Sequence, residues 1–243
     1  MKLYGRNPVL ERLKSNPKSI RKIFLQENHA EAGYIRSKAT KWGIPVLFVP
    51  QSKMIKISRS INTQGVLAEI DDFNYVLFDD LLTTATQKQH TILFLDNLND
   101  PQNLGVIIRS VACLGNFSIV LPTHGSVEVT EAVLRVASGG ENYVPMAKVA
   151  NLNRAIASAK EAGFWIAGGV VDGGKNLIET SLPFPLCLVI GSEQKGIREV
   201  VRQRLDLPLT IPMAQMKISF NVAQATTVFC YEIAKQKKKQ SPQ

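Results

Sequence analysis

The sequence predicts an α/β protein in which a small N-terminal α/β domain precedes a larger domain built on a parallel sheet. Short apolar runs rich in β-forming residues alternate with segments whose apolar residues recur at helical spacing, which is typical of parallel strands covered by helices. The excess of basic residues, in contrast, is confined to the N-terminal part. We therefore expect one domain over residues 1–72, a linker over 73–90 and a second domain over 91–243.

The N-terminal domain is expected to contain short elements of both types. Helical spacing of apolar residues predicts two helices, and runs of β-branched and aromatic residues predict three strands. The helices span residues 7–15 and 32–43, and the strands span 19–27, 45–50 and 64–70. Residues 73–90 lack the basic excess and end in a polar Thr/Gln stretch, so they are predicted to form the linker.

The second domain follows a regular alternation. The run TILFL at residues 91–95 suits a buried strand, and the apolar residues after it recur at helical spacing until Gly115. Further strands are predicted at residues 117–121, 164–171, 186–190 and 207–211, and helices at 102–114, 128–137, 152–162, 196–204 and 220–235. We expect a homodimer through the last helix, because its apolar face is long for a terminal helix and comprises Val222, Ala225, Val228 and Phe229.

The net charge of +9 comes from the N-terminal part of the chain. Residues 1–60 contain 13 Lys or Arg and three acidic residues, a net charge of +10, whereas residues 61–243 carry −1. Such an asymmetry indicates a module facing a polyanion such as RNA, and solvated helix faces without a partner are the alternative. The KQKKK run at residues 235–239 is different, because a basic run near a terminus is more often a solvating tail than a site.

Several other classes of protein are disfavoured. No stretch approaches the ~18 consecutive apolar residues of a membrane span, and no continuous apolar segment typical of a secretory signal stands near Met1. The three cysteines, Cys113, Cys187 and Cys230, show no metal-binding spacing and lie in apolar runs, so we expect buried, inert thiols. We expect a cytoplasmic protein with no membrane contact and no metal.

Three polar clusters in the second domain each follow a predicted strand, which is where ligands bind in open α/β sheets. They are DNLNDPQNLGVIIRS at residues 96–110, LVIGSEQKGI at 188–197 and LPLTIPMAQMKISFNVAQATTVF at 207–229. Helix capping explains the Asn and Asp residues of the first cluster, but it does not explain Gly105 inside the helix. We expect Gly105 to clear space for a ligand or a neighbouring backbone beside Arg109, on the buried side of the helix.

The three clusters, in this order, resemble the signature motifs of the SpoU/TrmH-type RNA ribose 2′-O-methyltransferases. The stretches YGRNPVLERL and NTQGVLAEI are similar to the ribosomal-protein-like substrate-binding domain of some members. The resemblance covers nearly the whole chain and implies an S-adenosylmethionine-dependent enzyme of the SPOUT superfamily that works as a homodimer. It also implies a deep trefoil knot in the catalytic domain, which the periodicity of the sequence does not show.

The resemblance implies the site residues as well. Those that match the family's catalytic residues are Asn103, Arg109, Glu193, Ser219 and Asn221. Those expected around the cofactor are Thr123, Gly168, Gly191, Ile211, Met213, Ser219 and Phe220. Three positions depart from the family pattern: Gln194 and Gln215 replace small residues, commonly Gly, and Phe220 replaces a usual Leu. We expect these departures to reshape the cofactor cleft without removing a polar group.

The residue types are consistent with methyl transfer to a 2′-hydroxyl. This reaction needs the nucleophile held in line near the methyl carbon and some loss of its proton, so positioning supplies much of the catalysis. Arg109 offers five fixed donors that suit a phosphate or ribose oxygen, and it is a poor general base. Glu193 is expected to hold Arg109 or Asn103, with an ordinary acid at a helix N-terminus as the alternative. The proton acceptor stays open, with the substrate phosphate as one candidate.

Two other functions compete with this interpretation. A Rossmann-type methyltransferase or dehydrogenase would show G-x-G-x-x-G after its first strand, whereas GGVVDGGKN at residues 168–176 is differently spaced and follows a later strand. A non-catalytic RNA-binding protein of the same fold would have no need of a cofactor cleft. Within the enzyme interpretation, the additional N-terminal domain favours ribosomal RNA over tRNA, and the resemblance favours a guanosine of the large-subunit RNA.

Overall fold

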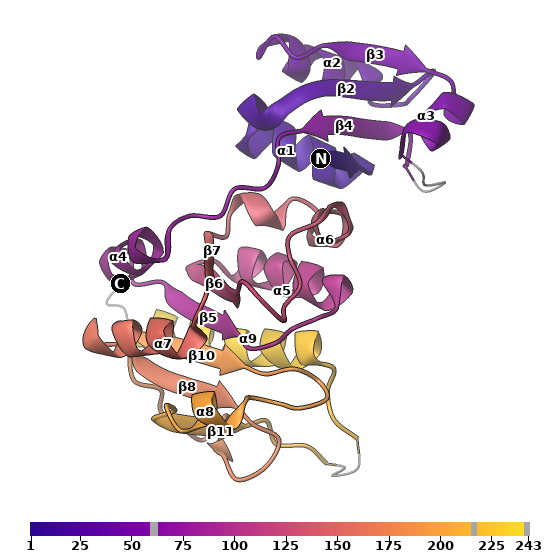
Figure 1. The fold of residues 1–243 in the computed structure, drawn as a ribbon. Helices are drawn as coiled ribbons and strands as arrows, with labels where there is room; N and C mark the ends of the chain where they lie inside the picture. The colour runs from indigo at the N-terminus through magenta and orange to yellow at the C-terminus, as the bar shows by residue number, and fades with distance from the viewer. Residues whose placement is uncertain (59–62, 215–217, 241–243) are drawn as a thin grey trace.

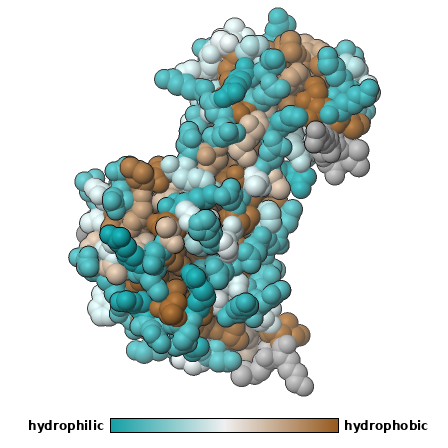
Figure 2. Space-filling model, in the orientation of Figure 1, coloured by the Kyte–Doolittle hydropathy of each residue, from teal (hydrophilic) through white to brown (hydrophobic). Residues whose placement is uncertain are grey.

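The computed structural model describes residues 1–58, 63–214 and 218–240. Two lobes, each built on its own sheet, are joined by an extended segment (Figure 1). The sheets have four and seven strands, and helices accompany both. This confirms the predicted α/β class, with a small N-terminal sheet and a large parallel sheet. On the face drawn in Figure 2, hydrophilic residues cover most of both lobes and hydrophobic residues are scattered among them.

The N-terminal sheet has the strand order β1-β4-β2-β3 and is mixed, because β2 and β3 are parallel and the other pairs are antiparallel. Its strands are β1 (Lys2–Tyr4), β2 (Ile20–Gln26), β3 (Val46–Val49) and β4 (Val66–Ile70). The helical segments of this lobe are α1 (Arg6–Ser15), η1 (Pro17–Ser19), α2 (Ala32–Thr40) and α3 (Gln51–Ser58). The sequence patterns predict neither β1 nor α3, which are only three and eight residues long.

The larger sheet is parallel throughout and has the strand order β7-β6-β5-β10-β8-β11-β9. Its strands are β5 (Thr91–Leu95), β6 (Phe117–Pro122), β7 (Met146–Val149), β8 (Trp165–Gly169), β9 (Lys175–Asn176), β10 (Leu186–Ile190) and β11 (Leu207–Thr210). The central strands β5 and β10 are buried along their whole length, as the apolar runs predict. The short strands β7 and β9 are not predicted.

The described part of the second lobe contains six α-helices. They are α4 (Phe78–Gln87), α5 (Pro101–Leu114), α6 (Glu131–Ala137), α7 (Leu152–Glu161), α8 (Glu199–Arg202) and α9 (Val222–Gln240), and a short 3-10 turn, η2, spans Gly140–Asn142. Helix α4 lies within the interval predicted as a linker and buries Leu81 and Ala85 against the second domain. Helix α9 continues to Gln240, so the lysine run at 235–239 is helical.

Helix α9 packs against the chain's own α5 and β8. Val222 and Phe229, two residues of the predicted dimer face, are 7% and 3% exposed and belong to the protein's own core. The other two, Ala225 and Val228, are half-buried and exposed, respectively. The expected apolar face of this helix is therefore divided between the interior and the surface.

The connections of the sheet create a switch point between β5 and β10. After β5 the chain adds β6 and β7 on one side, then crosses to β8 on the other side, and β10 finally inserts between β5 and β8. Leu93 of β5 lies opposite Leu188 of β10 in the parallel register, so the two strands end together. Crevices at such switch points are the usual ligand sites of open α/β sheets.

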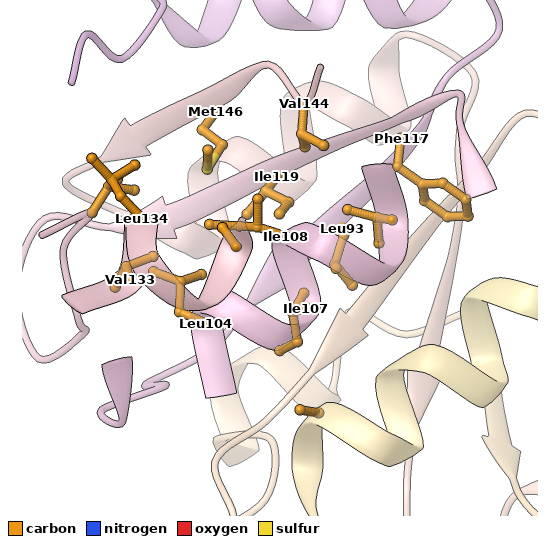
Figure 3. Close-up of a cluster of buried hydrophobic side chains, with 14 of the residues drawn as sticks. Leu93, Leu104, Ile107, Ile108, Phe117, Ile119, Val133, Leu134, Val144 and Met146 are labelled. Atoms are coloured by element: carbon orange, nitrogen blue, oxygen red, sulfur yellow. The ribbon is translucent and has the colours of Figure 1, made fainter. Parts of the chain in front are cut away.

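The apolar face of α5 packs on this sheet. Figure 3 shows Leu104, Ile107 and Ile108 of α5 meeting Leu93 and Ile119 of the sheet. All five side chains are fully buried, and their cluster continues without interruption into the N-terminal lobe. The two lobes therefore share one hydrophobic core, and the position of α5 depends on both.

Candidate active site

The three polar clusters of the sequence meet at the carboxyl ends of β5 and β10. Two cavities, of about 570 and 420 Å³, open there and share Ser192 and Glu193 in their walls. The larger is lined from the segment after β5, with Asn103 at the start of α5, and the smaller from the segment that leads into α9, with Asn221. Residues more than 100 positions apart in the sequence thus form one site.

Glu193 connects the three clusters. Its Oε1 accepts a hydrogen bond of 2.7 Å from Asn103 Nδ2 and another of 2.7 Å from Asn221 Nδ2. The expected partnership of Glu193 with Asn103 is therefore present in the structure, and Asn221 is an additional partner. A carboxylate oxygen with two amide donors is fixed in orientation, so Glu193 holds the starts of α5 and α9 together.

Both asparagines take their positions from local helix-capping geometry. Asp100 caps α5 by accepting a 2.8 Å hydrogen bond from the Gln102 N–H, and Pro101 occupies the first helical turn, where it needs no donor. Asn221 precedes α9, and its Oδ1 accepts a 2.8 Å hydrogen bond from the Ala223 N–H. Side chains from the first turn of α5 and from the residue before α9 therefore both donate to the Glu193 carboxylate, and helix dipoles favour a negative charge near a helix N-terminus.

A second carboxylate, Asp96, supports the loop that carries Glu193. Asp96 is fully buried at the end of β5, and it accepts hydrogen bonds from Arg198 through the backbone N–H at 2.9 Å and through Nε at 2.7 Å. These bonds tie residue 198, beyond the second cluster, to the first cluster. Sequence reasoning did not identify this pair, although an acid directly after a buried strand was an available signal.

The loop after β10 is tightly folded on itself. The backbones of Ser192 and Gly196 exchange hydrogen bonds of 3.1 and 2.8 Å, and Gly196 has a φ of 61°. A Cβ at Gly191 would lie 2.0 Å from the Gly196 carbonyl carbon, so the loop closes only around glycine. The glycines of the second cluster therefore set the position of Glu193.

The smaller cavity contains most of the residues predicted to surround the cofactor. Five of the seven line it, namely Gly191, Ile211, Met213, Ser219 and Phe220. Thr123 and Gly168 are not among the described lining residues. A side chain at Gly168 would point at Leu205, and its neighbour Gly169 forms the cavity wall instead. Of the residues that depart from the family pattern, Gln194 lines the larger cavity and Phe220 the smaller one, whereas Gln215 lies outside the described residues.

Arg109 lies elsewhere on α5 than the sequence predicts. It is exposed rather than on the buried side, and it is not among the described lining residues of either cavity. A Cβ on Gly105 would lie 2.5 Å from Val136 Cβ and 2.9 Å from the Val133 carbonyl oxygen, both on α6. Of the two roles proposed for Gly105, the structure therefore shows close approach to a neighbouring helix, and the space is occupied by α6 rather than by a ligand.

The three cysteines differ in their burial. Burial raises the pKa of the Cys187 and Cys230 thiols, which keeps them protonated. Cys113, in contrast, is exposed, which corrects the expectation that all three cysteines are buried. In residues 1–58, 63–214 and 218–240, no group of three or more His, Cys, Asp or Glu side chains is placed to hold a metal ion. None of the helices within these ranges is long and apolar enough to cross a membrane.

Two known protein families match this chain, one over each lobe. The SpoU rRNA Methylase family matches residues 90–231, and the RNA 2′-O ribose methyltransferase substrate-binding family matches residues 2–76. A Bacillus subtilis protein assigned to the TrmH family as a tRNA/rRNA methyltransferase is 34% identical over 233 residues, which cover 94% of this chain and 93% of the relative.

Solved structures show the same architecture. An RNA methyltransferase assigned to the TrmH family from Porphyromonas gingivalis has a TM-score of 0.74 and 28% identity, and the match covers 95% of this chain and 88% of the other. The SpoU methyltransferase AviRb from Streptomyces viridochromogenes, solved with its cofactor AdoMet, has a TM-score of 0.82 at 20% identity, with 98% and 91% covered. At that identity the second match supports the fold alone. Together with the family matches and the 34% identical relative, these findings show that the chain belongs to the SpoU/TrmH family of RNA methyltransferases and carries the family's N-terminal substrate-binding domain.

Proposed function

We propose that this protein transfers a methyl group from S-adenosylmethionine to a ribose 2′-hydroxyl of RNA, and that a guanosine of large-subunit ribosomal RNA is its target. The observation that carries the proposal is the Glu193 carboxylate, which holds Asn103 and Asn221 at the junction of two cavities. Two cavities with a common wall suit a reaction between two bound molecules, one in each. Transfer of a methyl group to tRNA is the alternative within the same chemistry.

The smaller cavity fits S-adenosylmethionine. Gly169 and Gly191 bring backbone to its wall, Ile211 and Met213 offer apolar surface, and Ser219 offers a hydroxyl. A nucleoside with an amino-acid side chain needs such a mixture of backbone groups, apolar contacts and a few polar groups. The family neighbour AviRb is solved with AdoMet, which supports the assignment. When bound, S-adenosylmethionine supplies an electrophilic methyl group.

The residues of the chain would act mainly by positioning. Asn103 lines the larger cavity and is held by Glu193, so we assign to this pair the orientation of the RNA ribose. Ser219 and Asn221 lie on the wall of the smaller cavity and would order the side facing the cofactor. We assign to Arg109 the binding of a phosphate or ribose oxygen, because its planar group of donors matches such oxygens.

A homodimer is part of the proposal. Val106 of α5 and Val228 and Tyr231 of α9 are 39%, 37% and 60% exposed, and Thr227 joins the two helices through a 2.9 Å hydrogen bond to Ser110. These helices present apolar side chains on the surface, as a pairing face does. Arg109 belongs to the same helix as Val106, so pairing through α5 and α9 would bring Arg109 close to the partner chain.

We further propose that residues 1–72 capture the RNA and that residues 91–243 catalyse the transfer. Tyr34, Trp42 and Phe48 of the N-terminal lobe are 46%, 53% and 45% exposed, and the Lys38 ammonium lies 5.6 Å from the centre of the Tyr34 ring. Exposed aromatic rings among lysines suit unpaired bases and phosphates of RNA. The net charge of +10 on residues 1–60 supports the same role.

The test combines cofactor binding with mapping of the modified nucleotide. Calorimetry on the full chain is expected to show binding of S-adenosylmethionine without RNA. Nucleotide-resolution mapping of 2′-O-methyl groups, with and without the gene, is expected to show the loss of one site in large-subunit ribosomal RNA. Loss of a site in tRNA would establish the alternative substrate. RNA binding without any methyl transfer would favour the non-catalytic RNA-binding protein and overturn the proposal.

A further inference from the structure

A large cavity lies at the amino ends of the parallel strands, whereas the candidate active site lies at their carboxyl ends. It has a volume of about 1190 Å³ and is bordered by Thr91 and Phe117, the first residues of β5 and β6. Lysines from two segments line it, and we name it the lysine groove. These lysines are Lys88, Lys235, Lys237, Lys238 and Lys239. No acidic side chain is found among its described lining residues.

The groove is formed where the C-terminal ends of α4 and α9 meet. Lys88 and Gln89 follow α4, and the last turns of α9 supply the other lysines. Lys88 and Lys237–Lys239 line the same cavity, so the residue after α4 and the last turns of α9 lie close together. The charge of the KQKKK run is therefore held in a helix next to a further lysine, rather than spread along a solvating tail.

Lysines from both sides of the groove lower the pKa of the same histidine, His90. His90 is half-buried, and its pKa is lowered first by burial and then by the positive charges of Lys237 and Lys88. Burial also lowers the pKa of Lys237 itself. Glu232 offsets part of the charge through its 2.8 Å ion pair with Lys235. Lys88, Lys238 and Lys239, which are all exposed, give the groove a positive potential that favours the binding of an anion.

The groove and the active site are separated by the length of α9. Val222 lines the smaller active-site cavity and Lys239 lines the groove, and a rise of 1.5 Å per residue separates their positions by about 25 Å. A single nucleotide cannot reach both places. A folded RNA can, because its phosphates extend over such distances.

We infer that the lysine groove binds the phosphodiester backbone of the substrate RNA, at nucleotides distant from the one that is methylated. This inference rests on the RNA substrate of the proposed function. Lysine ammonium groups suit phosphates as point charges without reading sequence. Lys88, Lys238 and Lys239 line the groove and are all exposed, so their ammonium groups are accessible to phosphate oxygens. The concave shape suits an RNA strand better than a flat membrane surface.

The experiment compares two triple variants of the full chain. The groove variant is Lys88→Gln/Lys238→Gln/Lys239→Gln, and the control is Arg154→Gln/Arg202→Gln/Arg204→Gln. All six side chains are exposed, so both variants should fold, and both remove the same charge. Affinity for a labelled 40-nucleotide RNA hairpin is measured from about 50 to 300 mM salt, with calorimetry of S-adenosylmethionine on the same samples.

The groove variant is expected to bind the hairpin about tenfold more weakly, and the slope of log affinity against log salt is expected to fall by about 1 for each lysine that contacts a phosphate. The control variant should keep nearly the parent slope, and both variants should bind S-adenosylmethionine as the parent does. Equal loss in the two variants, or no loss in either, would overturn the inference. Absent S-adenosylmethionine binding in the parent chain would instead overturn the proposed function.

A second measurement needs no variant. Acetylation of lysines in the full chain, read by mass spectrometry, is expected to slow at Lys88, Lys238 and Lys239 when the hairpin is present. Unchanged acetylation at these three positions would contradict the inference. Binding of the parent chain to phosphatidylserine vesicles that the groove variant loses, with hairpin binding unchanged, would assign the groove to a membrane surface and also contradict it.

Discussion

Arg12 of α1 donates a 2.9 Å hydrogen bond to Glu141 of η2, and the two side chains are 6% and 0% exposed. This buried ion pair joins the N-terminal lobe to the second lobe. Burial raises the pKa of Glu141, while the Arg12 charge opposes that shift. Because η2 also packs against α5, the contact between the lobes continues to the helix that carries Asn103 and Arg109.

The first prediction follows from this pair. Arg12→Met leaves the Glu141 carboxylate buried without its partner, so we expect the free energy of unfolding to fall by about 3–5 kcal/mol. The double variant Arg12→Met/Glu141→Leu should recover much of the loss, because no charge stays buried. Urea denaturation measures both. Arg21→Met is the control, since it breaks an exposed 2.6 Å pair with Asp71 and should change little. A double variant no more stable than Arg12→Met would contradict the explanation.

Glu193 provides the second prediction. Glu193→Gln keeps an oxygen that can accept from Asn103 and Asn221 but removes the negative charge, whereas Glu193→Ala removes the acceptor as well. We expect the single-turnover rate of methyl transfer to fall by about 10²-fold in the first variant and further in the second, as for other losses of preorganised electrostatic groups. In Glu193→Gln, melting and S-adenosylmethionine affinity should change little, because an acceptor for Asn103 and Asn221 remains. Glu199→Gln, at an exposed acid outside the site, should keep the parent rate.

Arg109 provides the third prediction. Because its side chain is exposed, Arg109→Ala should leave the melting temperature nearly unchanged, while the single-turnover rate is expected to fall by about two to three orders of magnitude. Arg109→Lys should restore little of the rate, since an ammonium cannot reproduce a planar group of donors. The control is Arg154→Ala, which removes another exposed arginine. An Arg109→Ala sample with the parent rate would exclude Arg109 from the mechanism.

The helices and strands around the site could be predicted where neighbouring residues in the sequence determine them. The strand at residues 91–95 and the helix after it are encoded by an apolar run, a capping Asp100 with Pro101, and a regular apolar repeat. The expectation that Glu193 holds Arg109 or Asn103 rests on the family resemblance, which makes all three site residues, and on the chemistry of their side chains. The structure shows Glu193 hydrogen-bonded to Asn103. Periodicity could not place them together, because 90 residues separate them and only the insertion of β10 beside β5 makes them neighbours.

Other parts of the interpretation depend on which segment packs against a given residue, and the sequence pattern does not identify that segment. Gly105 indicates a close approach, but only the structure shows that α6 is the neighbour. The apolar face of α9 has the same pattern whether it packs on its own sheet or on a partner, and Phe229 is in fact in the core. The lysine run of α9 likewise has the sequence pattern of a solvating tail, and only the structure shows that Lys88 lines the same cavity.

The N-terminal lobe provides the fourth prediction. Deleting residues 1–72 would uncover Glu141 and part of the shared core, so exposed point variants test RNA capture more cleanly. Arg36→Gln/Lys41→Gln should weaken binding of the RNA hairpin and lower its salt slope by up to about 2, because each lost cation removes at most one phosphate contact. S-adenosylmethionine affinity should stay unchanged by calorimetry. Unaltered RNA affinity would mean that this face of the lobe is merely solvated.

The fifth prediction concerns pH and His90, whose Nδ1 lies 3.1 Å from Ser118 Oγ. Burial, followed by Lys237 and Lys88, lowers its pKa in the folded chain, so the unfolded chain binds more protons between the two pKa values. The contribution of His90 to stability is therefore present above the unfolded value of about 6.5 and is lost as the pH falls below it. We expect His90→Gln to flatten this part of the stability profile, measured by urea denaturation from pH 8 to 5. A profile of unchanged slope would contradict this linkage.

The same histidine reports on the lysine groove. An RNA phosphate bound between Lys88 and Lys237 would offset the two charges that help to lower the pKa of His90, so RNA binding should raise that pKa. Titration of the His90 ring signals by NMR, with and without the 40-nucleotide hairpin, measures the shift. Neutral RNA analogues that lack phosphate charge should leave the pKa unchanged. The Lys88→Gln/Lys238→Gln/Lys239→Gln variant should show a smaller shift with RNA than the parent chain, because the phosphate would no longer be held in the groove; an equal shift would place the bound RNA outside it.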